Sequence, residues 1–229
     1  MPRLRLAALL ALLRPTATGG AAAGVACGAR FERPAHPKPD LSLSPTNASF
    51  DHWNLFAPFV AKIGPRWHLY YAGGPKTQPE YLAYQIGLAT APGPEGPWTK
   101  HGTPLLPLGT EDNFHATPTL LRGAGNEVLR EGGLYSMLYC GNRNDTIYRA
   151  TSRDGVVWTK NTKAVFKGYA PNVVRGPDGM LWLFSILKPA GKLWEVSLAK
   201  GRDWDSLETV RTLLVSNTQP WEDGNMFYP

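Results

Sequence analysis

Acidic residues recur at nearly the same distance before a proline in this chain of 229 residues. Asp51 stands seven residues, and Asp112 six residues, before a proline that opens a short apolar run. Glu222 stands seven residues before the final residue, again a proline, and Asp223 follows it directly. Two carboxylic acids facing one substrate, one protonated and one ionised, are the groups that cleave a glycosidic bond. Asp51, Asp112 and Glu222 are therefore the candidate catalytic residues.

Because the acids have the same place in different repeats, we expect their carboxylates to lie close together in the folded protein. Carboxylates from different repeats that point at one axis would repel and desolvate one another, which raises the pKa of at least one of them. The third repeat, VFKGYAP, has no acid at this place. Acids before a strand are also common loop residues that satisfy the backbone of a turn, and this structural alternative stays open for each of them.

The prolines mark an internal repeat. Pro58, Pro118, Pro171 and Pro229 are spaced 60, 53 and 58 residues apart, and similar sequences surround them. Within the second unit, the segments TPTLLR, LYSMLYCG, TIYRATS and VWTK are rich in β-branched and aromatic residues, and turn residues separate them. No segment has a sustained helical period. A repeated unit of this length with four strands predicts an all-β fold, a β-propeller with four-stranded antiparallel blades.

The repeat also predicts how the chain is divided. We expect a signal or targeting peptide at 1–29, a lead-in rich in proline and serine at 30–50, and a partial propeller at 51–229, with blades near 51–110, 111–166 and 167–220 and the start of another at 221–229. A propeller ring closes on itself, because an open ring exposes a sheet face and strand edges. About three and a half blades therefore indicate a truncated product or a fragment, with a complete three-bladed protein as the alternative.

Strand order sorts the polar residues between two ends of the blades. The connections into each first strand share one end with the loops between second and third strands, and the remaining turns lie at the other end. Asp154 and Asp178 fall in turns at that other end, where we expect them to be structural. Arg143 and Lys188 lie in loops at the first end, where they could balance the acids or hold a substrate hydroxyl or carboxylate.

Further candidates for substrate binding lie beside the acids. Asn54 and His115 precede landmark prolines and suit hydrogen bonds to sugar hydroxyls. Trp53 and Trp221 could stack on the face of a sugar ring. Asp223 completes the set of substrate-binding candidates.

The composition excludes one class of partner. Apolar residues make up 43% of the chain and aromatic residues 11%, which is enough for a sizeable core. The formal net charge is +6, but residues 1–38 hold six cations against one acid. The rest of the chain is therefore close to neutral, so we expect no nucleic-acid partner.

The first 29 residues resemble a targeting segment. A basic start, an apolar run from Leu6 to Leu13 and a stretch of small residues are the layout of a secretory signal peptide, and the run is too short to span a bilayer. We expect a secreted or exported protein, with organellar targeting as the alternative. Removal of the leader would take Cys27 with it and leave Cys140 without a partner for a disulfide.

Sequence motifs indicate no cofactor. The chain has no H-E-x-x-H, no paired-cysteine motif, no Walker or dinucleotide fingerprint and no G-x-S-x-G. Asp51 and Asp112 could help to hold a divalent cation on the axis, but their spacing does not require one.

The segments ATSRDGVVWTK, APNVVRGPDG and LYYAGGP…YQIGLAT resemble the five-bladed β-propeller glycosidases, the superfamily of arabinanases, levansucrases and invertases that includes glycoside hydrolase families 43 and 32. The resemblance covers about residues 50–229. It implies a five-bladed ring whose axial funnel holds three acids: a nucleophile or base, a supporting aspartate and a glutamate as acid. In family 43 the first acid directly precedes the first-strand proline, where this chain has Ala57, Thr117 and Ala170. The invertase-type N-D-P-N-G is also missing.

These observations favour a glycoside hydrolase that acts on a poly- or oligosaccharide. Asp112 would be the base or nucleophile, Glu222 the general acid, and Asp51 a positioning or pKa-tuning partner. One alternative is a propeller that binds a carbohydrate or a protein without catalysis, because fold alone does not separate the two. Another is an inactive fragment whose ring cannot close.

Overall fold

The structure, a computed structural model, describes residues 41–46, 48–74, 83–109, 114–141, 146–187 and 195–215. These residues belong to one compact unit, 39–229. Every regular element in the described ranges is a β-strand. A search of the same ranges for a helix long and apolar enough to cross a membrane finds none.

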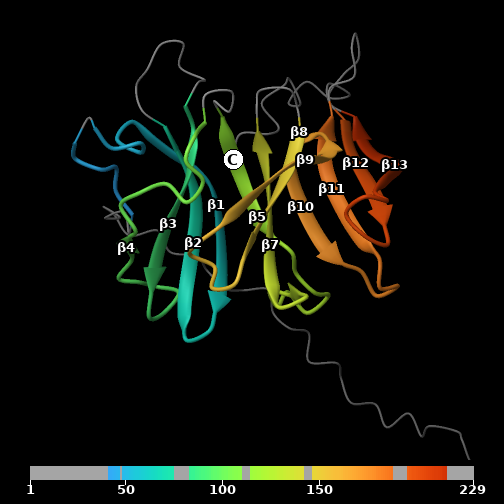
Figure 1. Ribbon diagram of the computed structural model, residues 1–229, viewed down its shortest axis with the longest axis horizontal. Helices are drawn as coiled ribbons and strands as arrows, with labels where there is room; N and C mark the ends of the chain where they lie inside the picture. The colour runs from blue at the N-terminus through green and yellow to red at the C-terminus, as the bar shows by residue number, and fades with distance from the viewer. Residues whose placement is uncertain are drawn as a thin grey trace, which may run out of the picture. The chain divides into compact units, whose positions relative to one another are not determined.

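The strands form three successive antiparallel sheets (Figure 1). The first sheet contains β1 (Asn54–Ile63), β2 (Arg66–Gly74), β3 (Gln85–Ala91) and β4 (Thr99–Lys100). The second contains β5 (His115–Leu120), β7 (Leu134–Gly141), β8 (Thr146–Ser152) and β9 (Thr159–Lys167), with the short β6 (Arg130–Glu131) paired to β7. The third contains β10 (Tyr169–Arg175), β11 (Leu181–Leu187), β12 (Glu195–Gly201) and β13 (Glu208–Val215). The predicted four-stranded antiparallel blades are confirmed, and β6 is an addition to them.

Each blade packs against the next because its strands bury both faces. In β7, Met137 belongs to the apolar cluster shared with the first blade, which includes Tyr70. The next residue, Leu138, belongs to the cluster shared with the third blade, which includes Leu183. Successive side chains of a strand point to opposite faces of its sheet. A sheet with a blade on either side therefore needs apolar residues without alternation, which explains the nearly continuous run LYSMLYCG in β7.

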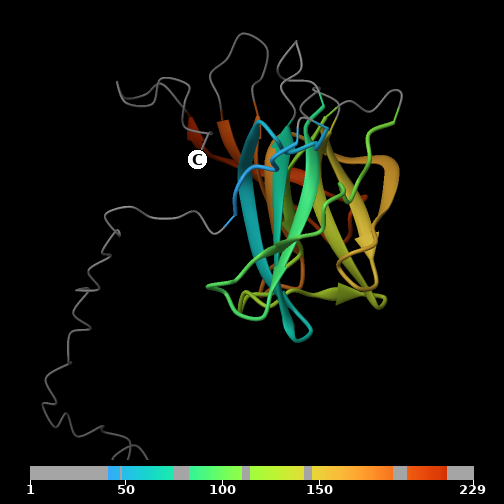
Figure 2. The same ribbon diagram turned by 90° about the vertical axis from the view of Figure 1, so that its left-hand side faces the viewer.

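The first strands of the blades, β1, β5 and β10, lie next to one another, and we call them the inner strands. Each runs toward a turn after which the chain returns as the second strand of its blade, in the second blade by way of β6. Figures 1 and 2 show that the β1–β2 turn lies at the opposite end of its blade from the segment that enters β1. We call the two ends the entry end and the hairpin end.

Two turns at the hairpin end are held by aspartates, as the sequence predicts. Asp154 Oδ1 accepts hydrogen bonds from the backbone N–H groups of Val156 and Val157, at 2.8 and 2.9 Å. Asp178 Oδ1 accepts from the backbone N–H of Met180 at 3.1 Å. Both acids satisfy the backbone of a tight turn, and their structural role is confirmed.

Candidate functional site

Each inner strand has a bulge at the residue that precedes its landmark proline. The pairing with the second strand shifts there in all three blades. Ala57, Thr117 and Ala170 have positive φ angles of 49°, 52° and 46°. A left-handed backbone costs a residue other than glycine about 1–2 kcal/mol, so the surrounding structure must impose it. Bulges of this kind turn side chains away from the regular strand direction, often beside functional sites.

Two polar groups near these bulges have unused hydrogen-bonding capacity within the described part of the chain. Thr117 Oγ1 and Asn54 Oδ1 are buried and have no hydrogen-bond partner there. The amide nitrogen of Asn54 donates to the hydroxyl of Tyr84 at 3.1 Å, which fixes the orientation of its side chain. Because buried polar atoms are nearly always paired, these two oxygens are places where a ligand or a water would gain a hydrogen bond.

Aromatic side chains connect the three blades near the same end. Phe56 and Tyr84 of the first blade meet edge to face, with ring centroids 4.9 Å apart. Tyr84 meets Phe114 at 5.5 Å, and Phe114 meets Tyr169 of the third blade at 6.4 Å. Such contacts restrain the inner strands relative to one another, so the bulges have fixed positions.

Asp51 lies at the entry end but is buried, with a 1% exposed side chain. Its carboxylate is 2.6 Å from Lys100 Nζ, and it accepts hydrogen bonds from the hydroxyls of Tyr71 and Ser49 at 2.9 and 2.8 Å. Burial acts to raise the pKa of Asp51, but the hydrogen bonds, above all from Lys100, outweigh it and lower the pKa to about 2. The raised pKa expected among the acids therefore does not occur at Asp51, whose carboxylate faces β2 and β4 of its own blade.

His115 is buried at the start of β5. Its side chain is fully buried, its Nδ1 is 2.9 Å from the carbonyl oxygen of Leu106, and its ring meets Tyr139 edge to face at 5.0 Å. The predicted hydrogen bonds of His115 to sugar hydroxyls stay a prediction, for a side chain that is buried in the described part of the chain. Trp53, by contrast, is 53% exposed at the start of β1, next to Asn54, as stacking on a sugar ring requires.

The remaining predicted site residues lie outside the described residues: Asp112, Arg143, Lys188, Trp221, Glu222 and Asp223. The assignments of the general acid and the base therefore stay predictions. Among the residues that the structure does describe, no group of three or more His, Cys, Asp or Glu side chains is arranged to hold a metal ion.

Sequence reasoning missed the role of the lysines that end the repeated W-T-K segments. Lys100 in β4 binds Asp51 and the hydroxyl of Ser44, both in the segment that leads into the first blade. Lys160 in β9 donates to the carbonyl oxygen of Pro107 at 2.9 Å, in the segment that leads into the second blade. The repetition of W-T-K was the available signal: in the first and second blades the lysine of this segment, in the last strand, binds the chain that enters the blade.

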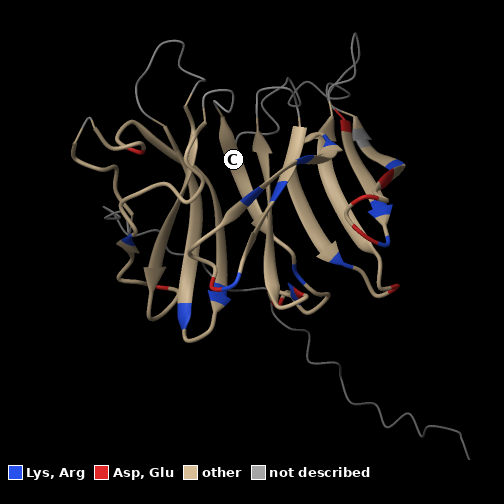
Figure 3. Cartoon of the chain, viewed as in Figure 1, with Lys and Arg blue, Asp and Glu red and all other residues tan. Residues whose placement is uncertain are grey.

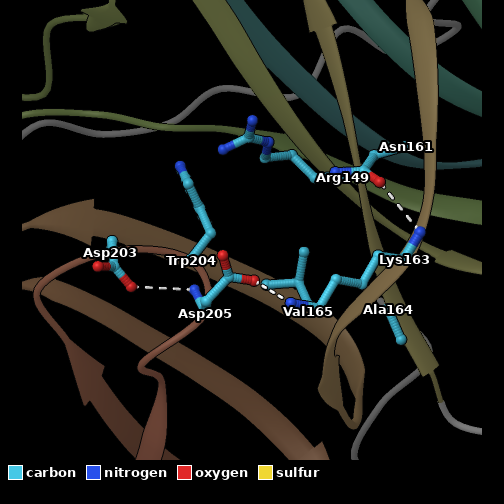
Figure 4. A pocket seen from close by; sticks show the side chains of 8 residues that line it. All are labelled: Arg149, Asn161, Lys163, Ala164, Val165, Asp203, Trp204 and Asp205. Atoms are coloured by element: carbon cyan, nitrogen blue, oxygen red, sulfur yellow. Dashed lines mark hydrogen bonds and ion pairs between the residues drawn. The ribbon is translucent and has the colours of Figure 1, made fainter.

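A hollow of about 120 Å³ lies between the second and third blades, beside β8, β9 and the β12–β13 turn (Figure 4). Side chains of both blades surround it. The guanidinium of Arg149 lies 5.1 Å from the ring of Trp204, and Lys163 Nζ is 2.5 Å from a carboxylate oxygen of Asp205. Sites for small molecules usually measure roughly 300–1,000 Å³. This smaller hollow is part of the packing between blades.

Searches with the sequence found no matching family model and no matching curated protein. Solved structures do match. A family 117 glycoside hydrolase from the marine bacterium Zobellia galactanivorans is 13% identical with a TM-score of 0.57, over 75% of this chain and 50% of that protein. The endo-arabinase from Bacteroides thetaiotaomicron is 15% identical with a TM-score of 0.58, over 75% and 66%. A glycosyl hydrolase from Bacteroides ovatus is 18% identical with a TM-score of 0.55, over 75% and 55%.

The fold is that of the β-propeller glycosidases. The match covers three quarters of this chain, and it spans half to two thirds of the length of these three proteins. The fold predicted from the repeated segments is confirmed.

Proposed function

We propose that this protein hydrolyses glycosidic bonds of a poly- or oligosaccharide. The observation that carries the proposal is the fold, which the chain shares with several glycoside hydrolases. The bulges at Ala57, Thr117 and Ala170 add support, because strained backbone repeated on three neighbouring inner strands is typical of a functional site.

The proposed chemistry uses two carboxyl groups. Glu222, as general acid, protonates the oxygen of the leaving group while Asp112 either activates a water or attacks the anomeric carbon itself. The configuration is inverted when the two carboxyl groups lie roughly 6.5–9.5 Å apart, which leaves room for the water, and retained at about 5–5.5 Å. Trp53 would stack on a sugar ring, and Asn54 would hydrogen-bond to its hydroxyls.

In this proposal Asp51 has an indirect role and does not contact the substrate. Its ion pair with Lys100 fastens the segment that enters β1, from which Trp53 and Asn54 extend. A buried carboxylate with all its partners inside the protein does not contact the substrate, so Asp51 is a positioning residue.

Hydrolysis is tested with the purified chain on a panel of aryl-glycosides and polysaccharides. We expect Asp112→Asn and Glu222→Gln each to lower the rate by about 10²–10⁴-fold, the usual contribution of a general acid or base. Asp205→Asn, at the exposed ion pair between the β12–β13 turn and β9, is the control and should keep full activity. Release of sugar that is unaffected by both carboxylate variants would contradict the assignment.

A second candidate is a propeller that binds a carbohydrate without cleaving it. The observation that favours it is the absence of a carboxylate from the three bulges, which hold Ala57, Thr117 and Ala170. Calorimetric titration together with product analysis separates the two functions. Binding of an oligosaccharide that stays intact after long incubation supports this candidate.

We also propose that the protein is secreted or exported. The proposal rests on the basic start, the apolar run and the small residues of 1–29. Sequencing the N-terminus of the mature protein from cells and from medium tests it, and an uncleaved chain found only inside cells would contradict it.

A further inference from the structure

Two hollows open at the hairpin end of the blades, whereas Asp51 lies at the entry end. One, of about 360 Å³, lies between the first and second blades. The other, of about 290 Å³, lies between the second and third blades. Arg122 and Asn126, in the turn that follows β5, line both hollows. The two hollows are therefore neighbours, divided by these two side chains.

Each hollow has one tryptophan from the same position of a blade. Trp67 is the second residue of β2 and lines the first hollow. Trp182 is the second residue of β11 and lines the other hollow. The repeat thus places two half-buried indoles on either side of the second blade's turn.

Trp182 is held firmly in place. Its indole N–H donates to Asp178 Oδ1 at 2.9 Å, and Lys200 Nζ lies 3.9 Å from its ring centroid. A Cβ atom at Gly176 would come within 2.4 Å of the indole nitrogen, so the glycine lets the ring lie against the backbone. A ring that is fixed before binding loses little conformational entropy when a ligand stacks on it.

The dividing side chains are also fixed. Arg122 donates through its two terminal nitrogens to Asn126 Oδ1 at 2.5 Å and Asn172 Oδ1 at 2.9 Å, and its guanidinium lies 5.3 Å from the centre of the Phe59 ring. Its Nε is buried and has no hydrogen-bond partner among the described residues. Asn126 is exposed, with a φ of 69°. Together they present planar donors and acceptors between the two tryptophans.

From this arrangement we propose that the hairpin end binds an oligosaccharide, with one sugar unit in the hollow of Trp67, one in the hollow of Trp182, and the linkage between them over Arg122 and Asn126. Indole rings complement the apolar face of a sugar ring, and guanidinium and amide groups complement its hydroxyls. The volumes are near the lower limit for small-molecule sites, which suits single sugar units. The choice of ligand class rests on the proposed function, whereas the site itself rests on these contacts.

The charges at this end do not favour a polyanion. Figure 3 shows Lys and Arg positions at the lower ends of β1, β2 and β10, with acidic positions close by. Lys62 and Glu127 both line the first hollow. Arg175, in the second hollow, is paired with Glu131. A mixed surface of this kind lacks the one-signed field that nucleic-acid binding needs.

The test is a titration of the full chain, labelled with ¹⁵N, with pure ladders of two to six units of glucose, xylose or arabinose. We expect the indole N–H signals of Trp67 and Trp182 to shift together. Affinity should rise with chain length until both hollows are spanned. Trp67→Ala should weaken binding about tenfold, which corresponds to about 1.4 kcal/mol.

Milder variants keep the test valid if a tryptophan variant does not fold. Asn126→Gly keeps the left-handed backbone and removes the shared amide, so it should weaken binding without lowering the unfolding temperature. Trp67→Phe should retain most of the affinity, and Asp205→Asn, at the exposed ion pair with Lys163, all of it. No indole shift with any ladder at millimolar concentration, or shifts unchanged by Trp67→Ala and Asn126→Gly, would overturn the proposal.

Glu222→Gln separates this site from the proposed catalytic one. Indole shifts that persist while hydrolysis is lost support an independent site, and shifts that disappear with the carboxylate overturn it. If the wild-type chain cleaves no ladder but the signals of Trp67 and Trp182 still move, the binding site stands and the hydrolase proposal fails.

Discussion

Two ion pairs of nearly equal length occupy opposite environments in this protein. Lys100–Asp51 measures 2.6 Å and its carboxylate is 1% exposed, whereas Lys163–Asp205 measures 2.5 Å between side chains that are 70% and 73% exposed. Solvent and side-chain entropy cancel most of the gain from an exposed pair. In a buried pair, removal of one partner leaves the other charge without compensation.

Asp51→Asn should therefore lower the free energy of unfolding by about 3–5 kcal/mol, and Asp205→Asn by less than about 1 kcal/mol. Urea denaturation of both variants beside the wild type measures the difference. Equal and small effects would show that the Asp51 carboxylate does not fasten the segment that enters β1.

The same carboxylate gives stability a defined pH dependence. The pKa of Asp51 falls from 3.8 to about 2 on folding, so the unfolded chain binds more protons between these values. The contribution, roughly 2 kcal/mol, is complete above about pH 4 and is lost as the pH falls toward 2. The difference between wild type and Asp51→Asn, followed by urea midpoints from pH 6 to pH 2, should shrink in this window. A difference that is constant with pH would argue against the low pKa.

The role of a single residue could be predicted where its hydrogen-bond partners are close to it in the sequence. Asp154 and Asp178 stand in recognisable turn sequences, and their structural role is confirmed. The partner of Asp51 lies 49 residues away in another strand, and no local pattern connects the two. His115 was predicted to bind sugar hydroxyls from its place before a landmark proline, and its contacts with Leu106 and Tyr139, which bury it, have no signal in the local sequence.

Two turns at the hairpin end contain a glycine with a positive φ but differ in their surroundings. Gly155, between β8 and β9, and Gly179, between β10 and β11, have φ angles of 79° and 75°. A Cβ at Gly155 would lie 2.7 Å from Ile63 Cδ1 and 2.9 Å from the Tyr70 hydroxyl oxygen, whereas a Cβ at Gly179 meets nothing within 4 Å.

Gly179→Ala should lower the free energy of unfolding by about 1–2 kcal/mol, because the only effect is an alanine with a left-handed backbone. Gly155→Ala should cost about 1–3 kcal/mol more, because the core must also move. Thermal unfolding of the two variants gives the comparison. Equal losses would mean that the first turn is not packed against the neighbouring blade as described.

The bulges lead to a prediction of the opposite sign. Ala57→Gly should raise stability by up to about 1 kcal/mol, because glycine adopts the positive φ without strain. Ala164→Gly, at an exposed place in β9, should lower stability by about 0.5–1 kcal/mol. Chemical denaturation of both variants checks the pair, and destabilisation by Ala57→Gly would contradict the strained geometry.

At the scale of elements, strand positions were predictable and bulges were not. Runs of β-branched and aromatic residues between turn sequences locate all four long strands of the second blade. A left-handed alanine or threonine before proline opposes the local preference of each residue. Only tertiary contacts impose it, so no propensity argument could have found it.

The three blades as a whole share two apolar interfaces that meet in β7. Met137→Ala weakens the packing against the first blade, and Leu138→Ala weakens the packing against the third. Each substitution should lower the free energy of unfolding by about 2–5 kcal/mol. Since the second blade belongs to both interfaces, calorimetry should show one transition that moves down in either variant. Separate transitions for separate blades would contradict this coupling and favour the inactive-fragment alternative.

At this scale the repeat predicts the architecture, because a unit of fifty to sixty residues with four strands has few ways to bury both faces. Strand order predicted the end of the blades at which each inner strand begins. The placement of Asp112 and Glu222 beside a substrate stays a prediction, since neither residue is among those described.

The two-sided burial of β7 restricts how such a chain can change in length. Deletion of one residue ahead of Met137 would turn the side chains of β7 to the opposite faces of its sheet. Side chains that pack against the first blade would then face the third blade, and those that pack against the third would face the first. The number of residues in β7 is therefore fixed by the two blades that pack against it.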